Sequence, residues 1–313
     1  MNLDPRHLQA FAATVEGGSL SAAAHTLRIT LAATSLRIKA LEEGLGQRLL
    51  VRGKTARATP AGQALLTHIK QVRLLEADLA HTLNPARKGF QAISVAVNAD
   101  SLASWFLSGV QAALQRHKLT LQVVVDDQDH TLEWLRMGDV VGCVTTLATP
   151  LRGCVAQSLG AMRYRCVAAP ALAHKLRASS NASASSNASA SAGAGTPSAH
   201  RLLATPAIGF NRKDTLQDQF LQQHLGLKDV NYPRHYLPAV DAYHQALLGG
   251  LGWGMEADIQ HAEDFAAGRL VDLFPGCTVQ VPLYWQHWQH EPPQAAWLTR
   301  AVKAAAGAKL VRV

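Results

Sequence analysis

The sequence contains few cysteines and few aromatic residues, and it has no long uninterrupted apolar run. Its 313 residues include four scattered cysteines without CxxC pairs, and 6% are aromatic. This pattern fits free thiols in a reducing compartment rather than a disulfide framework. No uninterrupted stretch of roughly 18 apolar residues occurs, which argues against a membrane span. The start MNLDPRHLQAF has no basic region followed by an apolar core, so we expect no secretory signal and a cytoplasmic protein.

The motifs of common catalytic sites are also missing. The chain has no GxSxG nucleophile turn, no HExxH motif and no Walker lysine loop, and GGLGWGM does not have the GxGxxG spacing. His287 and His290 flank Trp288, but two histidines without further ligands nearby are more often surface or core residues than metal ligands. The sequence therefore predicts that the protein is not an enzyme and that it has neither a metal site nor a cofactor.

Positive charge is concentrated in the first 90 residues. They hold twelve Lys and Arg against six Asp and Glu, whereas the remaining 223 residues hold eighteen against sixteen. The whole chain has a formal net charge of +8. A basic N-terminal third on a nearly neutral body is typical of a nucleic-acid-binding module. A solvated basic surface without a partner is the alternative.

Three short helices are predicted in the N-terminal segment. Asp4 and Pro5 form an N-cap followed by proline at the first helical position, and a Gly-Gly pair ends this helix. Ser19 and Thr30 can cap the second and third helices, which are joined by a tight turn. This arrangement is typical of a helix-turn-helix, whose later helix enters the major groove of double-stranded DNA. A small helical bundle is the alternative.

The third helix and the basic segment after it carry the candidate DNA contacts. Ile38, Leu41 and Leu45 make the buried stripe of this helix, and Thr34 begins the same stripe one turn earlier. LLVRGKTARATPAG then predicts a strand, a basic turn and a second strand, which would form a wing. The candidate DNA-binding residues are Thr30, Ser35, Arg37 and Lys39, with Arg52, Lys54 and Arg57 spaced to meet phosphates.

A long helix is predicted from Pro60 to about Leu83. Its apolar residues follow a coiled-coil-like spacing, interrupted by Glu76: Leu65, Ile69, Val72, Leu79 and Leu83. Such a stripe is suited to pairing two subunits, so we expect a homodimer. Packing of the helix against its own domain is the alternative.

The remaining chain alternates predicted strands and helices. AISVAV, LTLQVVV and VVGCVTT are predicted strands with helices between them, which favours parallel α/β sheets. The segment 178–199 has low complexity and is predicted to be a disordered surface loop. The sequence thus divides into a DNA-binding domain (1–60), a linker helix (61–90) and a C-terminal body (91–313).

Motifs spread over nearly the whole chain resemble those of LysR-type transcriptional regulators. The run from SLSAAAHTLRIT through SLRIKALEEGLGQRLLVR to ATPAGQALL is similar to the N-terminal motif of that family. SVAVNADSLASWFL, LRMGDVVGCV, FLQQHLGL, AAGRLVDLFPG and PLYWQHW resemble the ArgP/LysG branch, regulators of basic amino-acid export.

The resemblance implies an all-α winged helix-turn-helix, a long linker helix and a two-lobed α/β domain similar to periplasmic binding proteins. Lobe I would comprise 91–164 and 268–313, and lobe II would comprise 165–267 with the insert 178–199. It also implies a ligand in the cleft between the lobes, assembly as a homodimer or homotetramer, and RNA polymerase as a partner.

One departure from the family concerns base recognition. Relatives usually carry glutamine just after the cap of the third helix and often again five residues later, whereas this chain has Leu31 and Leu36. Glutamine amides can make bidentate contacts with adenine. Their loss predicts a different target sequence, more reliance on DNA shape and phosphates, or weaker DNA binding.

The candidate ligand site lies where predicted strands end. Ser101 stands at a strand-to-helix junction, where its hydroxyl and neighbouring N–H groups can hold a carboxylate. Thr145 and Thr146 end another strand, and Asp241 precedes a helix of the second lobe. The acidic candidates for holding an ammonium or guanidinium group are Asp100, Asp126, Asp127 and Asp241. The alternative is that these residues only cap helices or lie in solvated loops.

The sequence therefore predicts a LysR-type regulator that responds to a small molecule, with lysine or arginine as the expected effector, and controls amino-acid export or metabolism genes. Two alternatives come from other classes. One is a DNA-architectural or replication-control protein. The other is a solute-binding protein, against which the basic N-terminal domain and the missing signal argue.

Overall fold

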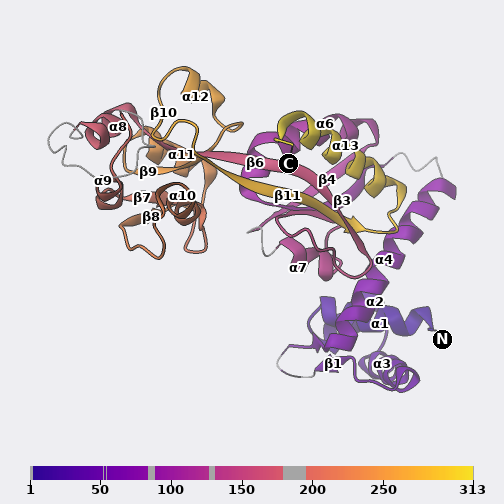
Figure 1. Cartoon of the computed structure of the whole chain (residues 1–313). Helices are drawn as coiled ribbons and strands as arrows, with labels where there is room; N and C mark the ends of the chain where they lie inside the picture. Colours follow the sequence, from indigo (N-terminus) through magenta and orange to yellow (C-terminus); the bar gives the residue numbers. More distant parts are fainter. Residues whose placement is uncertain are drawn as a thin grey trace.

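The computed structural model describes residues 3–51, 53, 55–83, 89–126, 131–178 and 195–312. The predictions for Arg52, Lys54, Asp127 and most of the insert 178–199 lie outside these residues. A helical N-terminal domain, a long helix and a two-lobed α/β body follow one another along the chain (Figure 1). None of the described helices has the length and apolar character needed to cross a bilayer.

The N-terminal domain consists of three helices and a two-stranded wing. Its elements are α1 (Pro5–Glu16), α2 (Leu20–Leu27), α3 (Leu31–Leu45), β1 (Leu50–Val51) and β2 (Arg57–Ala58). The hydroxyls of Ser19 and Thr30 accept hydrogen bonds from the N–H groups of Ala22 and Ala33 at 3.1 Å, which confirms both predicted caps. Arg28 has a φ of 54° and makes the tight turn between α2 and α3.

The core of this domain follows the predicted stripes. Phe11 is fully buried and lies in one apolar cluster with Ile38 and Leu41. Thr34 is buried as well, and its hydroxyl donates to the carbonyl of Thr30 at 3.1 Å. Because this bond satisfies the hydroxyl within the helix, only the methyl group has to fit the core.

The long helix α4 (Pro60–Leu83) joins the N-terminal domain to the body. Leu66 and Ile69 in its first half are buried in the N-terminal core. Lys70 forms an ion pair with Asp139 of the body at 2.5 Å. The first half of α4 therefore packs against its own chain. This is the alternative that the sequence left open to subunit pairing.

One nine-stranded sheet of the described residues runs through both lobes, in the order β4-β3-β5-β11-β6-β9-β7-β8 with β10 beside β6. Lobe I contains β3 (Gln91–Val97), α5 (Ala99–Ser101), the π-helical turn Leu102–Phe106, α6 (Leu107–Arg116), β4 (Leu119–Val125), α7 (Thr131–Arg136), β5 (Gly142–Thr145) and α13 (Pro293–Lys309). Lobe II contains α8 (Pro170–Arg177), α9 (Ala199–Ala204), β7 (Ala207–Gly209), α10 (Leu216–Leu225), β8 (Arg234–Tyr236), α11 (Val240–Leu248), β9 (Trp253–Ala257), α12 (Ala262–Ala266) and β10 (Val271–Asp272). The segment 268–313 was expected to belong to lobe I, but β10 pairs with the end of β6 at Val167 and Ala168 and therefore lies in lobe II.

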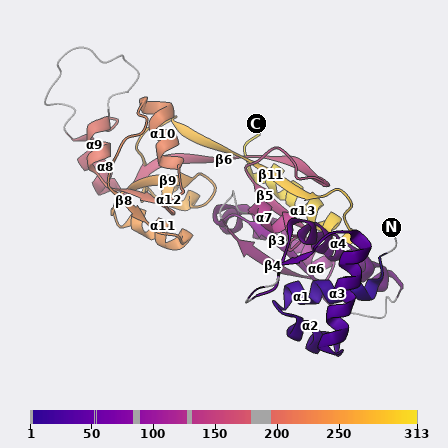
Figure 2. The same cartoon turned by 90° about the horizontal axis from the view of Figure 1, so that it is seen from below.

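Two long strands, β6 (Cys154–Ala168) and β11 (Thr278–Trp288), cross from one lobe to the other (Figures 1 and 2). They pair antiparallel along their length, whereas β3 is parallel to β4 and β5, and β7 is parallel to β8 and β9. The predicted parallel pairing is therefore confirmed for β3, β4 and β5, whereas the two crossing strands pair antiparallel. The reason is that strands, not helical crossovers, carry the chain between the lobes.

A continuous apolar core follows the crossing strands from lobe I into lobe II. In lobe I the fully buried Trp285 donates its indole N–H to the hydroxyl of Thr299 at 2.9 Å. In lobe II the indole N–H of Trp253 donates to the carbonyl of Leu202 at 3.0 Å. The core thus supports both walls of the space between the lobes.

Candidate DNA-binding surface and ligand cavity

The outer face of α3 is largely apolar. Leu36 is 66% exposed and Leu31 is 51% exposed. Ser35 and Arg37 are half-buried, and Lys39 is exposed and lies 3.6 Å from Glu43. With Leu31 and Leu36 exposed on its outer face, α3 offers few groups for reading base edges directly.

The other predicted DNA contacts are distributed around this helix. Thr30 is exposed, and its side chain is already used as the cap of α3. Arg57 is exposed on β2, one of the two wing strands. An exposed arginine on the wing is suited to a phosphate contact, which positions a protein on DNA without reading its sequence.

A cavity of about 630 Å³ lies between the lobes and reaches the crossing strands. Lobe I contributes residues at the ends of three parallel strands, and lobe II contributes the loop after β7, the start of α11 and the end of β9. Its polar lining comprises Asn98, Asp100, Asp126, Thr146, Tyr164, Asn211, Lys213, Asp214, Thr215, Gln219, Tyr243, Glu256, Gln260 and Gln280. The volume and the convergent polar groups are typical of a small-molecule site.

Acidic side chains outnumber basic ones in this lining. The pKa of Asp100 is raised to about 6, because burial and the nearby carboxylates of Glu256 and Asp214 raise it by more than the hydrogen bond from Tyr164 lowers it. The Tyr164 hydroxyl donates to Asp100 at 2.7 Å. A positively charged ligand group would relieve the repulsion among these carboxylates.

The neighbouring carboxylates are held in place by hydrogen bonds. Asp214 accepts from the N–H groups of Phe210 and Leu216 at 2.8 and 3.0 Å. Asp126 accepts from the indole of Trp134 at 3.0 Å. These contacts fix the carboxylates before a ligand arrives, which reduces the entropy lost on binding.

The predicted effector residues differ in how they relate to the cavity. Thr146 lines it, as do Asp100 and Asp126. Ser101 and Thr145 are buried and do not line it, and the Ser101 hydroxyl has no hydrogen-bond partner among the described residues.

Asp241 is exposed at the start of α11 and does not line the cavity. Val240 and Tyr243 of the same helix do line it. Residues one and two positions apart on a helix do not share a face, which explains why Asp241 points elsewhere.

Sequence reasoning missed several residues of the lining. Asn98 precedes α5, and its buried side-chain oxygen has no partner among the described residues, although it borders the cavity. Tyr164, Asp214 and Glu256 come from β6, the loop after β7, and β9. The position of Asn98 at a strand end was a usable signal, whereas the other three follow no local pattern.

An exposed helix-turn-helix with a wing, joined to a two-lobed domain with a polar cavity, defines a DNA-binding protein with a separate sensor domain. The model of the bacterial regulatory helix-turn-helix protein, lysR family, matches residues 5–63, and that of the LysR substrate binding domain matches residues 92–307. The chain belongs to the LysR family of transcriptional regulators.

Relatives and solved structures give the same result. The transcriptional regulator ArgP of Pseudomonas aeruginosa is 38% identical over 312 residues, which are 99% of this chain and 98% of the relative. The crystal structure of ArgP from Mycobacterium tuberculosis has a TM-score of 0.88 at 36% identity and covers 100% of both chains. Full-length LysG from Corynebacterium glutamicum with bound effector Arg has a TM-score of 0.81 at 30% identity, covering 98% of this chain and 99% of that one.

Proposed function

We propose that this regulator binds arginine or lysine in the cavity between its lobes and controls genes for amino-acid export or metabolism. The observation that carries the proposal is the group of carboxylates from both lobes, Asp100, Asp214 and Glu256, around a cavity of about 630 Å³. The arginine bound to the similar LysG protein supports the same ligand class.

The cationic groups of the ligand would face these carboxylates. The α-carboxylate would lie at the start of α5, where first-turn N–H groups lack helical partners. Ser101 would donate a further hydrogen bond after rotation of its side chain, because its hydroxyl is buried and has no partner among the residues that the structure describes. Asp127, Thr145, Thr146 and Asp241 remain the other proposed effector residues.

Calorimetry of the full chain with arginine, lysine and citrulline tests the ligand. Citrulline has nearly the shape of arginine but no positive charge, so it should bind much more weakly. Ser101→Ala should lose roughly 1–3 kcal/mol of affinity for arginine. Ser108→Ala is the matched control, because the Ser108 hydroxyl at the start of α6 already donates to the carbonyl of Trp105 in the preceding π-helical turn. Equal binding of arginine and citrulline would contradict the proposal.

The ligand would act by shifting the population of lobe arrangements and thereby the spacing of the DNA-binding domains. Footprinting of genome fragments with and without arginine tests this step. A ligand-dependent change in the protected region is expected, and an identical footprint under both conditions would contradict it. Thr30, Ser35, Arg37, Lys39, Arg52, Lys54 and Arg57 are the proposed DNA contacts.

We propose that the second half of α4 pairs two subunits. Leu75, Leu79 and Leu83 are exposed there and form an apolar stripe on the surface of the single chain. Light scattering should show a dimer or tetramer, and Leu79→Glu should dissociate it, whereas Leu251→Glu on lobe II should not. A monomeric wild-type protein at micromolar concentration would contradict this.

The proposed function also includes a cytoplasmic location and RNA polymerase as a partner of the DNA-bound regulator.

A further inference from the structure

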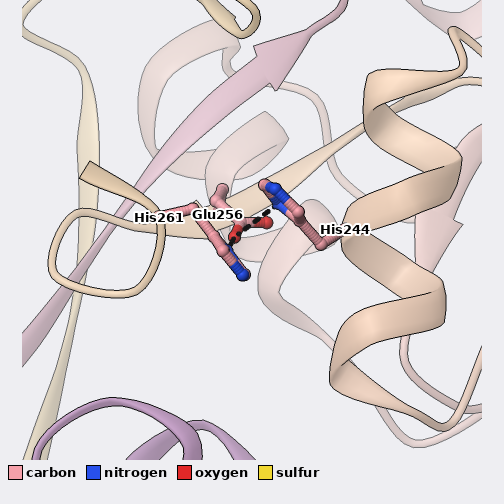
Figure 3. Close-up of side chains that lie close together, drawn as sticks. All are labelled: His244, Glu256 and His261. Carbon is pink, nitrogen blue, oxygen red and sulfur yellow. Dashed lines mark hydrogen bonds and ion pairs between the residues drawn. The ribbon is translucent and has the colours of Figure 1, made fainter. Parts of the chain in front are cut away.

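A cluster of two histidines and a glutamate lies in lobe II beside the cavity. His244 belongs to α11, Glu256 to β9, and His261 precedes α12 (Figure 3). Their candidate ligand atoms all lie within 4.8 Å of one another. Figure 3 shows dashed lines that join the Glu256 carboxylate to both imidazole rings. Three chain segments therefore bring nitrogen and oxygen donors to one point.

We propose that His244, Glu256 and His261 form a site for a divalent transition-metal ion, with Zn²⁺ as the expected occupant. Two imidazoles and one carboxylate are a ligand set that zinc uses in proteins. This ligand set differs from the oxygen-rich sites that magnesium and calcium prefer. The site shares Glu256 with the cavity proposed for the amino acid, whereas His244 and His261 do not line that cavity.

The geometry at His244 supports a cation between the donors. Its Nδ1 is buried, has no hydrogen-bond partner in the described part of the chain, and lies 3.4 Å from a carboxylate oxygen of Glu256. Two ligands on a tetrahedral zinc ion, with bonds of about 2.05 Å, are separated by about 3.3 Å. The nitrogen and the oxygen thus already have the spacing of neighbouring zinc ligands.

Asp264 supplies the support that a metal-bound histidine needs. The Nε2 atom of His244 lies 2.6 Å from a carboxylate oxygen of Asp264. A carboxylate at Nε2 favours the proton on that nitrogen and leaves the lone pair on Nδ1, which faces Glu256. Arg269 pairs with the other oxygen of Asp264 and holds the carboxylate in place.

His261 gives the site both flexibility and access. Its ring stacks on that of His244 with centroids 3.4 Å apart, and its Nδ1 forms a short contact with Glu256. A metal would replace this contact, and the His261 ring would tilt away from its stacked position to direct its lone pair at the ion. The side chain is 23% exposed, whereas those of His244 and Glu256 are 6% and 3% exposed, so His261 is the entry side.

The direct test is a zinc titration of the full chain, freed of any affinity tag and dialysed against a chelator, in competition with a chromogenic chelator. We expect one tight zinc ion per chain. Asp264→Asn should lose roughly 10–100-fold in affinity. His261→Gln and His244→Gln should lose at least as much. His235→Gln is the matched control, since it removes a half-buried histidine of lobe II outside the cluster.

Cobalt provides a readout that does not depend on the stability of a variant. Co²⁺ added to the wild-type protein should give the visible absorption bands of a nitrogen-ligated ion with low coordination number, and His261→Gln should abolish them. Far-UV circular dichroism verifies that this variant is folded. Wild-type protein without such bands, or zinc affinity unchanged in His261→Gln, would overturn the site and leave surface histidines as the binding groups.

Discussion

The DNA-binding domain and the sensor domain place their functional residues in opposite ways. In the first, the recognition helix and the wing lie within 30 consecutive residues, from Thr30 to Thr59. In the second, the cavity draws on β3, β4, β6, β9, β11 and the loop after β7. A local surface depends on one helix and one hairpin, whereas a distributed cavity depends on the packing of two lobes. The sensor should therefore be more sensitive to changes in its core.

Removing a core residue that does not line the cavity should show this sensitivity most strongly. Trp285 is fully buried and hydrogen-bonded to Thr299, so Trp285→Ala should destabilise the sensor domain by about 3–5 kcal/mol. Thermal unfolding and arginine calorimetry measure the effect. Leu36→Ala, at an exposed position, should change stability by less than about 0.5 kcal/mol. Equal losses in the two variants would break the comparison.

The charge of the cavity should control affinity and its pH dependence. Asp100→Asn keeps an oxygen that accepts the Tyr164 hydrogen bond but removes a charge, so arginine affinity should fall by roughly 10–100-fold. Because the pKa of Asp100 is raised to about 6, wild-type affinity should also decline as the pH falls below that value. Calorimetry from pH 5 to 8 measures both effects. A decline of the same size in Asp100→Asn would contradict the role of this carboxylate.

In the ligand-free protein, the carboxyl group of Asp100 should lower the folding stability as the pH rises, which is the opposite of its effect on arginine affinity. A raised pKa means that the folded state holds the proton more tightly, so the stabilising contribution is present at acid pH and is lost as the pH rises through about 6. The loss is at most about 3 kcal/mol, since one pKa unit corresponds to 1.36 kcal/mol. Melting curves of Asp100→Asn should lack this component, whereas the exposed Asp229→Asn should retain it.

Restoring an amide on α3 should sharpen base recognition without affecting the fold. Leu36 is exposed, so Leu36→Gln should be tolerated and should improve binding to sites with adenine at the facing position by about 1–3 kcal/mol. Selection from a randomised duplex library measures the preference. Leu251→Gln, an equivalent exchange on the sensor, should leave it unchanged. An unaltered preference in Leu36→Gln would show that α3 does not read that base.

The smallest expected effect comes from the wing. Arg57→Ala should weaken binding to all duplexes alike and reduce the slope of log affinity against log salt by about one. Titrations at several salt concentrations on two unrelated duplexes measure it. Arg116→Ala removes an exposed arginine from the sensor and should have no effect. A loss confined to one duplex would indicate base reading instead of a phosphate contact.

Elements with strong local signals were predictable from the sequence. The caps at Ser19 and Thr30, the buried Thr34, the long helix α4 and the family all follow from neighbouring residues and motifs, and the structure or the comparisons confirm them. The antiparallel crossing strands were not predictable, because strand periodicity does not specify the direction of pairing. The positions of Asp214 and Glu256 in the cavity lining were not predictable either, because they depend on how the two lobes pack.

The sequence by itself determined the DNA-binding domain, since helix caps, apolar stripes and a basic hairpin act over a few residues. It also determined that an α/β sensor domain follows. Only the tertiary structure decided which carboxylates surround the cavity, why Ser101 and Asp241 lie outside its lining, and how His244, Glu256 and His261 meet. The physical reason is that antiparallel crossing strands and lobe packing join segments more than 100 residues apart, such as Asp100 and Glu256.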